Sequence, residues 1–133
     1  MIKACLRSAK NSKPLQPKNA NMITWNKLDQ ETQLDEIIAE SKEKPVLIFK
    51  HSTTCPISGT AKDRLERQWG EQLNSVKPYY LDLLSYRPIS NKIAQVFEVQ
   101  HESPQVLLIR DGACVYNASH LAISAKSVEA KVA

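Results

Sequence analysis

A cysteine marks the point where a predicted strand passes into a predicted helix, within the segment KHSTTCPIS at residues 50–58. Cys55 directly precedes Pro56, and because proline is favoured at the first helical position, Cys55 is expected at the N-cap. Its sulfur would then face free backbone N–H groups and the positive end of the helix dipole, which both stabilise thiolate relative to thiol. Cys55 is therefore a candidate nucleophile. The alternative is a small buried hydrophobic side chain beside a proline that only opens the helix.

Polar residues on either side of Cys55 indicate how such a site would be arranged. Ser58 follows three positions later, as in a capping box, so its hydroxyl is expected to donate a hydrogen bond to the sulfur, although it cannot form a disulfide. His51 would favour the thiolate when protonated, or it is a solvated residue at a strand end. Thr53 and Thr54 would shape the pocket or cap the following helix.

The number and spacing of the three cysteines also limit which disulfide and metal chemistry is possible. Cys5, Cys55 and Cys114 are odd in number and widely spaced, which excludes a fully paired disulfide framework and favours a reducing compartment. Cys114 is expected in the core, whereas the role of Cys5 stays open. Cys55 and His51 are the only close pair of metal-ligand type, and a zinc site needs four ligands, so no metal is expected. Three scattered glycines exclude a glycine-rich phosphate loop.

Length and charge exclude several classes of protein. The chain has 133 residues, of which 42% are hydrophobic, as expected for one globular domain. Its net charge of +4 is uneven: residues 1–21 hold five of the 18 basic residues and no acidic one, so residues 22–133 carry thirteen bases against fourteen acids. That part therefore lacks the basic surface of a nucleic-acid-binding protein. No apolar run approaches the ~20 residues of a membrane helix, and no secretory signal core is present.

The chain divides into a tail and a patterned domain. Residues 1–21 are rich in Lys, Asn and Ser and show no periodicity, so they are predicted to be a disordered N-terminal tail. Residues 22–133 are predicted to form the single domain. Met22 opens the patterned region, so a start of the biological chain at Met22 stays an alternative.

Hydrophobic periodicity predicts the elements of that domain. Residues 45–51 are almost continuously apolar, which is typical of a strand covered on both faces of a sheet. Asp111-Gly112 is the signal for a two-residue type I′ hairpin between strands at 105–110 and 113–117. Further strands are expected at 23–25 and 78–84, and helices at 29–44, 56–73, 88–99 and 122–131. Two parallel crossovers followed by an antiparallel hairpin predict an α/β fold with a mixed sheet of four to five strands and helices on both faces.

This order of elements, with Cys-Pro-Ile-Ser at a strand-to-helix junction and Ser103-Pro104 before a later strand, resembles the thioredoxin superfamily over residues 23–130. More narrowly, the segment from His51 to Ser58, together with Glu102-Ser-Pro-Gln105, resembles the YtxJ-type monothiol bacilliredoxins of the bacillithiol system. The first motif is fairly specific to that family, and the second is short and supportive.

The resemblance implies a small cytoplasmic thioredoxin-like oxidoreductase that removes bacillithiol, or a similar low-molecular-weight thiol, from mixed disulfides on other proteins. Cys55 would be the nucleophile, with Ser58 where dithiol relatives carry the resolving cysteine. Thr54, Pro56, Ser103 and Pro104 would bind the substrate. The Ser103-Pro104 bond would be cis and would face Cys55, leaving the Ser103 backbone free to pair with an extended chain. No cofactor is expected beyond a transient thiol adduct on Cys55, and the protein is expected to act as a monomer, without nucleic acid or membrane.

Four positions depart from related families, and two other functions stay open. Phe49 stands six residues before the nucleophile, where thioredoxins carry a buried acid, and Thr54 replaces their aromatic residue. Pro56 and Ile57 replace the Gly-Phe of cluster-binding monothiol glutaredoxins, which weakens an iron–sulfur carrier as an alternative. The other alternative is a non-catalytic binding or stress-response module in which Cys55 only records oxidation.

Overall fold

Five strands form one sheet in the spatial order β2-β4-β3-β5-β6. The computed structural model describes residues 23–132. The elements in chain order are β2 (Asn26–Lys27), α2 (Gln33–Glu40), β3 (Val46–His51), α3 (Pro56–Gln68), η2 (Glu71–Leu73), β4 (Lys77–Asp82), α4 (Arg87–Val96), β5 (Gln105–Arg110), β6 (Ala113–Ser119), η3 (His120–Ala122) and α5 (Ala125–Val132). The predicted tail at residues 1–21 and Cys5 lie outside the described residues.

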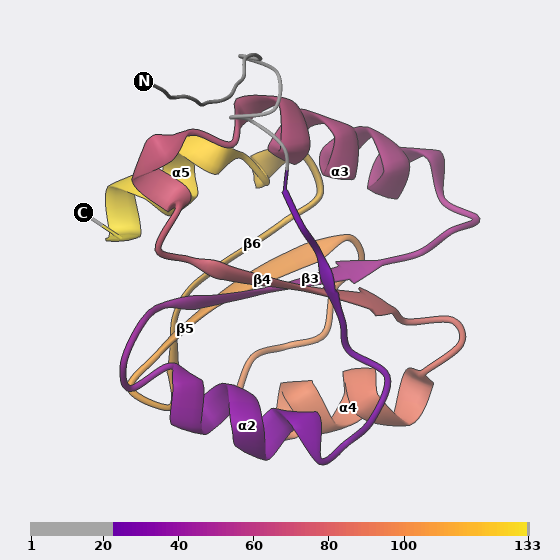
Figure 1. The fold of residues 1–133 in the computed structure, drawn as a ribbon. Coiled ribbons are helices and arrows are strands. Elements are labelled where there is room, and N and C mark those ends of the chain that lie inside the picture. Colours follow the sequence, from indigo (N-terminus) through magenta and orange to yellow (C-terminus); the bar gives the residue numbers. More distant parts are fainter. Residues whose placement is uncertain (1–22, 133) are drawn as a thin grey trace, which may run out of the picture.

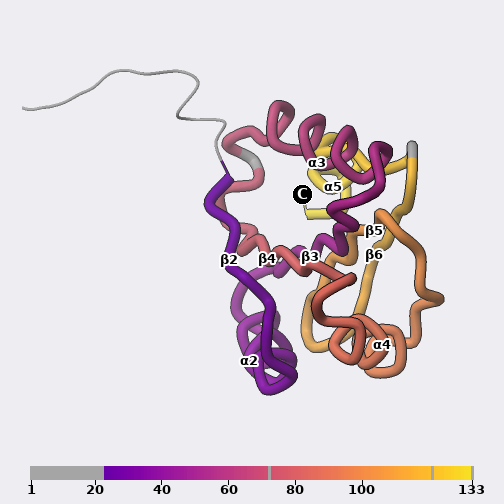
Figure 2. The backbone as a smooth tube through the Cα atoms, turned by 90° about the vertical axis from the view of Figure 1, so that its right-hand side faces the viewer, coloured from indigo at the N-terminus to yellow at the C-terminus, as the bar shows by residue number. Residues whose placement is uncertain are grey.

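The sheet is mixed and has helices on both faces, as predicted. β2, β4 and β3 run parallel, while β5 pairs antiparallel with β3 and with β6. Figure 1 shows α3 and α5 above the sheet and α2 and α4 below it, and the turned view of Figure 2 shows the same three layers. The α/β class with a five-stranded mixed sheet is therefore confirmed.

β3 is the central strand, and its two sets of side chains enter different cores. All six of its residues are buried, as the continuous apolar run predicted. Val46 and Ile48 pack with α2 and α4, whereas Leu47 and Phe49 pack with α3 and α5. Because successive side chains of a strand point to opposite faces, Lys50 continues the first set and His51 continues the second.

The hairpin between β5 and β6 has the predicted turn. Asp111 has φ 52° and Gly112 has φ 77°, and two positive φ angles are what a type I′ turn requires. The turn is tied to the end of α2, because the backbone N–H of Gly112 donates to Ser41 Oγ at 2.8 Å and that of Asp111 donates to the Ser41 carbonyl at 2.9 Å.

Some predicted boundaries and burials were wrong. The first helix begins at Gln33 rather than residue 29, because the Gln33 side-chain oxygen accepts the backbone N–H groups of Asp29 and Gln30 and closes a separate turn there. The first strand is Asn26–Lys27 rather than 23–25. Helical spacing by itself predicts Ile57 and Val96 on inward faces, but they are 50% and 39% exposed, as the second residue of α3 and the last residue of α4.

Candidate active site

Cys55 occupies the N-cap of α3, as predicted. It has extended backbone angles, Pro56 is the first helical residue, and the Cys55 carbonyl accepts the N–H groups of Ser58 at 3.1 Å and Gly59 at 3.2 Å. The thiol is partly exposed, and the neighbouring Thr54 and Pro56 are exposed. The sulfur itself makes no capping hydrogen bond to the helix. Cys55 is therefore a free, reachable thiol beside the positive end of a 13-residue helix.

The Ser58 hydroxyl is bound to another partner than the one predicted. Its oxygen accepts the backbone N–H of Ser52 at 3.0 Å and lies 2.6 Å from His51 Nδ1. No hydrogen bond joins Ser58 to Cys55 Sγ among the residues that the structure describes. The reason is geometric: Ser58 is fully buried at the third position of α3, where its side chain points inward onto the end of β3. Ser58 therefore ties the first turn of α3 to the strand and to the loop that leads to Cys55.

His51 is a buried imidazole with 8% of its surface exposed. Its burial and the nearby charge of Lys62 lower its pKa, and Asp82, Glu66 and the interaction with Ser58 only partly oppose this. The imidazole is therefore neutral at neutral pH. A neutral ring with its proton on Nε2 accepts a hydrogen bond at Nδ1 from the Ser58 hydroxyl. His51 thus positions Ser58 and does not bring a positive charge to the thiol under those conditions.

Phe49, which stands where the resemblance to thioredoxins predicts a buried acid, packs against Trp25. Phe49 is fully buried, its ring stacks on Trp25 at a centroid distance of 5.8 Å, and it lies 5.7 Å from the His51 ring. The indole N–H of Trp25 donates to Glu66 Oε2 at 2.7 Å, and Glu66 is ion-paired with Lys62 at 2.8 Å. The carboxylate that contacts this cluster, Glu66, is thus on α3 and already has two partners.

We expect acid to destabilise the protein partly through His51. Because the folded-state pKa of His51 is below its ordinary 6.5, the unfolded chain binds more protons as the pH falls below about 6.5, so the free energy of unfolding decreases there. His51→Phe removes that titration and keeps a ring of similar size. Urea unfolding at pH 7.5 and 5.5 should show a smaller loss for the variant than for wild type. An equal loss in both proteins would show that His51 does not contribute.

Ser103 and Pro104 lie next to the Cys55 loop through strand pairing. The Ser103-Pro104 bond is cis, as the resemblance implied. Lys50 of β3 is paired with Gln105 of β5, so the residues just before Gln105 lie beside those just after Lys50. The Pro104 carbonyl accepts the N–H of His120 at 3.0 Å, which anchors this loop to the end of β6.

The same loop contains contacts that sequence reasoning missed. The Gln105 side-chain oxygen accepts the N–H of Glu102 at 3.3 Å, and its amide donates to the Gln100 carbonyl at 3.0 Å. Lys50 is fully buried and lies 3.2 Å from His101 Nδ1. A lysine inside a strongly apolar strand indicates that its ammonium has a polar partner in the fold. The partner, His101, is 51 residues away and could not be predicted from the local pattern.

Cys114 is remote from Cys55. Cys114 of β6 is paired with Ile109 of β5, and Ile109 is paired with Val46 at the beginning of β3. Cys55 follows the other end of β3. Five strand residues at about 3.3 Å each separate those ends by roughly 16 Å, well beyond the ~7 Å that a disulfide tolerates between Cα atoms. Burial also raises the pKa of the Cys114 thiol, which donates to the Tyr116 carbonyl. Cys114 therefore packs against the core and is not part of the Cys55 site.

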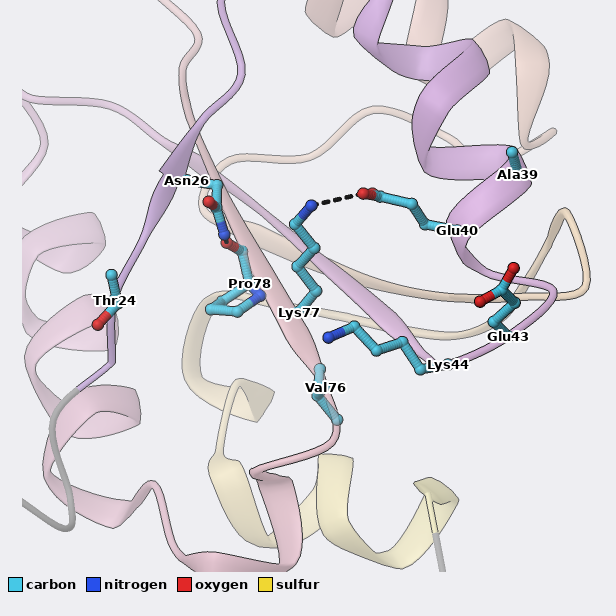
Figure 3. A pocket seen from close by; sticks show the side chains of 9 residues that line it. All are labelled: Thr24, Asn26, Ala39, Glu40, Glu43, Lys44, Val76, Lys77 and Pro78. Carbon is cyan, nitrogen blue, oxygen red and sulfur yellow. Dashed lines mark hydrogen bonds and ion pairs between the residues drawn. The ribbon is translucent and has the colours of Figure 1, made fainter.

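Two hollows flank β4, and they lie at opposite ends of it. Figure 3 shows the larger one, a cavity of about 570 Å³ at the beginning of β4, where Lys77 and Glu40 form an ion pair. Since Cys55 follows the other end of the parallel strands, this cavity is not part of its site. The smaller one, of about 230 Å³, includes Tyr80 and Asp82. Asp82 is paired with His51, the last residue of β3 before the Cys55 loop, so this recess lies at the Cys55 end of the parallel strands.

The comparison with known proteins agrees with this geometry. Residues 26–128 match the family model described as monothiol bacilliredoxin BrxC. The chain belongs to this family. The match includes the strand-to-helix junction with Cys55, the Phe49 position and the Ser103-Pro104 loop. Membership confirms the resemblance that the motifs indicated, and it supports a thiol oxidoreductase role for a bacilliredoxin with this fold.

Solved structures place the bacilliredoxin domain among thioredoxin folds. One, described as a candidate oxidoreductase with a thioredoxin fold, is 33% identical, with a TM-score of 0.70, covering 89% of this chain and 98% of that one. A thioredoxin from Malassezia sympodialis is 13% identical, with a TM-score of 0.67 and coverage of 92% and 96%. A thioredoxin from Fasciola hepatica is 16% identical, with a TM-score of 0.62 and coverage of 80% and 95%. The last two show the shared fold alone.

Two further features of residues 23–132 concern membranes and metal ions. None of the described helices has the length and apolar character needed to cross a membrane. No group of three or more His, Cys, Asp or Glu side chains in this part of the chain is arranged to hold a metal ion.

Proposed function

We propose that this bacilliredoxin is an enzyme that removes bacillithiol, or a similar low-molecular-weight thiol, from mixed disulfides on other proteins through Cys55. The observation that carries the proposal is a single reachable thiol at the N-cap of α3, with a buried serine in place of a second cysteine at position 58. Such a site supports one exchange step and has no neighbouring thiol in the described residues to begin a second one.

The proposed reaction is one thiol–disulfide exchange. The Cys55 thiolate attacks the sulfur of the small thiol in the mixed disulfide, so a new S–S bond forms between Cys55 and the small thiol. The bond to the target protein breaks, and the target leaves as a thiolate that takes up a proton. Cys55 then carries the small thiol until an external thiol attacks the adduct, which returns Cys55 to its reduced state and releases a disulfide.

Two groups of residues support this assignment of roles. Thr54 and Pro56 are exposed on either side of Cys55, where they would contact the mixed disulfide. Ser103 and Pro104 would receive the backbone of the target protein as an extended segment. Regeneration by an external thiol requires a reducing compartment, so we place the activity in the cytoplasm.

The direct test follows the small thiol. A protein carrying a bacillithiol mixed disulfide is mixed with excess reduced enzyme, and intact-mass spectrometry follows both chains. We expect the target to lose one bacillithiol and Cys55 to gain it, with the adduct persisting until a thiol is added. A target that keeps its bacillithiol in the presence of a fully alkylatable Cys55 would overturn the proposal and would favour a binding or sensing module.

The iron–sulfur carrier remains the competing chemistry for a monothiol site. Anaerobic purification in the presence of a low-molecular-weight thiol should yield a colourless protein if the proposal is right. A coloured protein with the absorption of a cluster that disappears in Cys55→Ala would instead assign Cys55 to cluster binding.

A further inference from the structure

Lys50 is a buried lysine without a carboxylate partner among the described residues. Its side chain is fully buried, on the sheet face that carries α2 and α4, whereas Cys55 and Ser58 belong to the helix on the other face. Within residues 23–132, none of the ion pairs includes Lys50. Burial lowers the pKa of its ammonium to about 8, so it is charged at neutral pH. Burying an unpaired charge destabilises a fold, so this lysine needs a reason other than stability.

The two partners of Lys50 lead to the loop before β5. Its ammonium lies 3.2 Å from His101 Nδ1 and donates to the Ser90 carbonyl of α4 at 3.4 Å. The Ser90 hydroxyl lies 3.3 Å from the same imidazole nitrogen. An ammonium can only donate, so His101 Nδ1 is an acceptor and the ring is neutral with its proton on Nε2. Lys50 and Ser90 therefore both lie against the same imidazole nitrogen.

His101 belongs to the segment that carries Ser103 and Pro104. Its neighbour Glu102 is fixed by Gln105, and Gln105 is the cross-strand partner of Lys50 itself. Lys50 thus contacts the loop at residues 100–104 through His101, and it is also paired with Gln105 at the beginning of β5, which follows that loop. Lys50 lies near the end of β3, and the chain that follows this strand leads to Cys55.

We propose that Lys50 is a positioning residue: through His101 it holds residues 100–104 in place beside the Cys55 loop, where the backbone of a protein substrate has to bind. This inference rests on the proposed function for the identity of the substrate and adds which residues align it. Lys50 touches neither the thiol nor the reacting sulfur in this role. It acts on the segment that would receive the target chain.

The arrangement depends on the protonation of His101. Burial and the charge of Lys50 lower the pKa of His101, Arg87 contributes in the same direction, and Glu102, which faces His120 at 3.9 Å, opposes them. When the pH falls through this pKa, Nδ1 gains a proton and no longer accepts from Lys50 or Ser90. The contact between Lys50 and His101 is therefore made above that pH and lost below it. Above about pH 8 the neutral Lys50 amine still has N–H groups to donate.

The test compares Lys50→Met with Lys92→Met, a matched control on the surface of α4. Two reactions are followed at pH 7: small-thiol transfer from an extended peptide carrying a mixed disulfide, and alkylation of Cys55 by iodoacetamide, which needs no substrate loop. We expect Lys50→Met to slow peptide transfer roughly tenfold while alkylation stays within about twofold, because only alignment is lost. We also expect a rise in Tm of about 3 °C or more, since the buried charge is gone. Lys92→Met should match wild type in both rates.

Two readouts test the positioning without turnover. In Lys50→Met, NMR titration should show the pKa of His101 rising toward its ordinary value, and the Glu102 amide should exchange hydrogen faster. His101→Phe, which keeps Lys50 and removes the acceptor, should slow peptide transfer as Lys50→Met does. Unchanged peptide transfer in both variants would overturn the inference, and so would an equal slowing of peptide transfer and alkylation. If wild type accepts no small thiol at all, the proposed function fails, while the titration and exchange data still decide whether Lys50 positions the loop.

Discussion

Replacing Cys55 with Ala should abolish transfer of the small thiol, with a loss of at least about 10³-fold in the rate. Cys55 is the only described thiol at the end of β3, and exchange needs an attacking sulfur. Release of free bacillithiol and the intact mass of the enzyme after one turnover measure the effect. Wild type should carry one adduct and Cys55→Ala none.

The matched control is Cys114→Ala. Cys114 pairs at the far end of the β3–β5–β6 ladder and is half buried, so this variant should keep the wild-type rate and the wild-type adduct. A large loss of rate in Cys114→Ala at unchanged stability would place a second functional sulfur in the molecule. Cys5 should be replaced in all proteins that are compared, so that only the described cysteines contribute to the signal.

Replacing Ser58 with Cys should allow the enzyme to release the small thiol from the Cys55 adduct by itself. The variant contains Cys-Pro-Ile-Cys within one helical turn, and a second sulfur at this spacing can attack an adduct on the first. We expect the adduct on Cys55 to be lost without any external thiol, with an internal disulfide in its place, while wild type keeps its adduct. Mass spectrometry of alkylated samples after a single turnover distinguishes a bound small thiol from a loss of two hydrogen atoms.

The surroundings of Ser58 decide how fast that step is. A thiol at this position lies against His51, because the serine oxygen is 2.6 Å from Nδ1, and a neutral imidazole can accept the thiol proton. The double variant Ser58→Cys with His51→Phe should therefore release the adduct more slowly than Ser58→Cys alone. Rapid release by wild type, without added thiol, would mean that another cysteine resolves the adduct and that the enzyme is not monothiol.

Local rules explain why so much of the site could be predicted. A proline at the first helical position places Cys55 at the N-cap, and Asp111-Gly112 produces a type I′ turn, because both depend on the φ angles of a few adjacent residues. The apolar run of β3 likewise required burial on both faces. Where local patterns competed with packing, predictions were wrong: Ile57 has helical spacing for the core, yet it is 50% exposed, whereas Ser58 beside it is fully buried.

The sequence by itself determined the order of elements, the position of the nucleophile and the absence of a second cysteine beside it. Tertiary structure alone decided which groups surround them. Ser58 pairs with His51 rather than with the sulfur because the first turn of α3 packs on the end of β3. Lys50 reaches His101 only because β5 pairs antiparallel to β3 and returns that loop to its side chain. Hydrogen bonds between residues far apart in the chain depend on strand register and helix packing, which no local pattern of residue types contains.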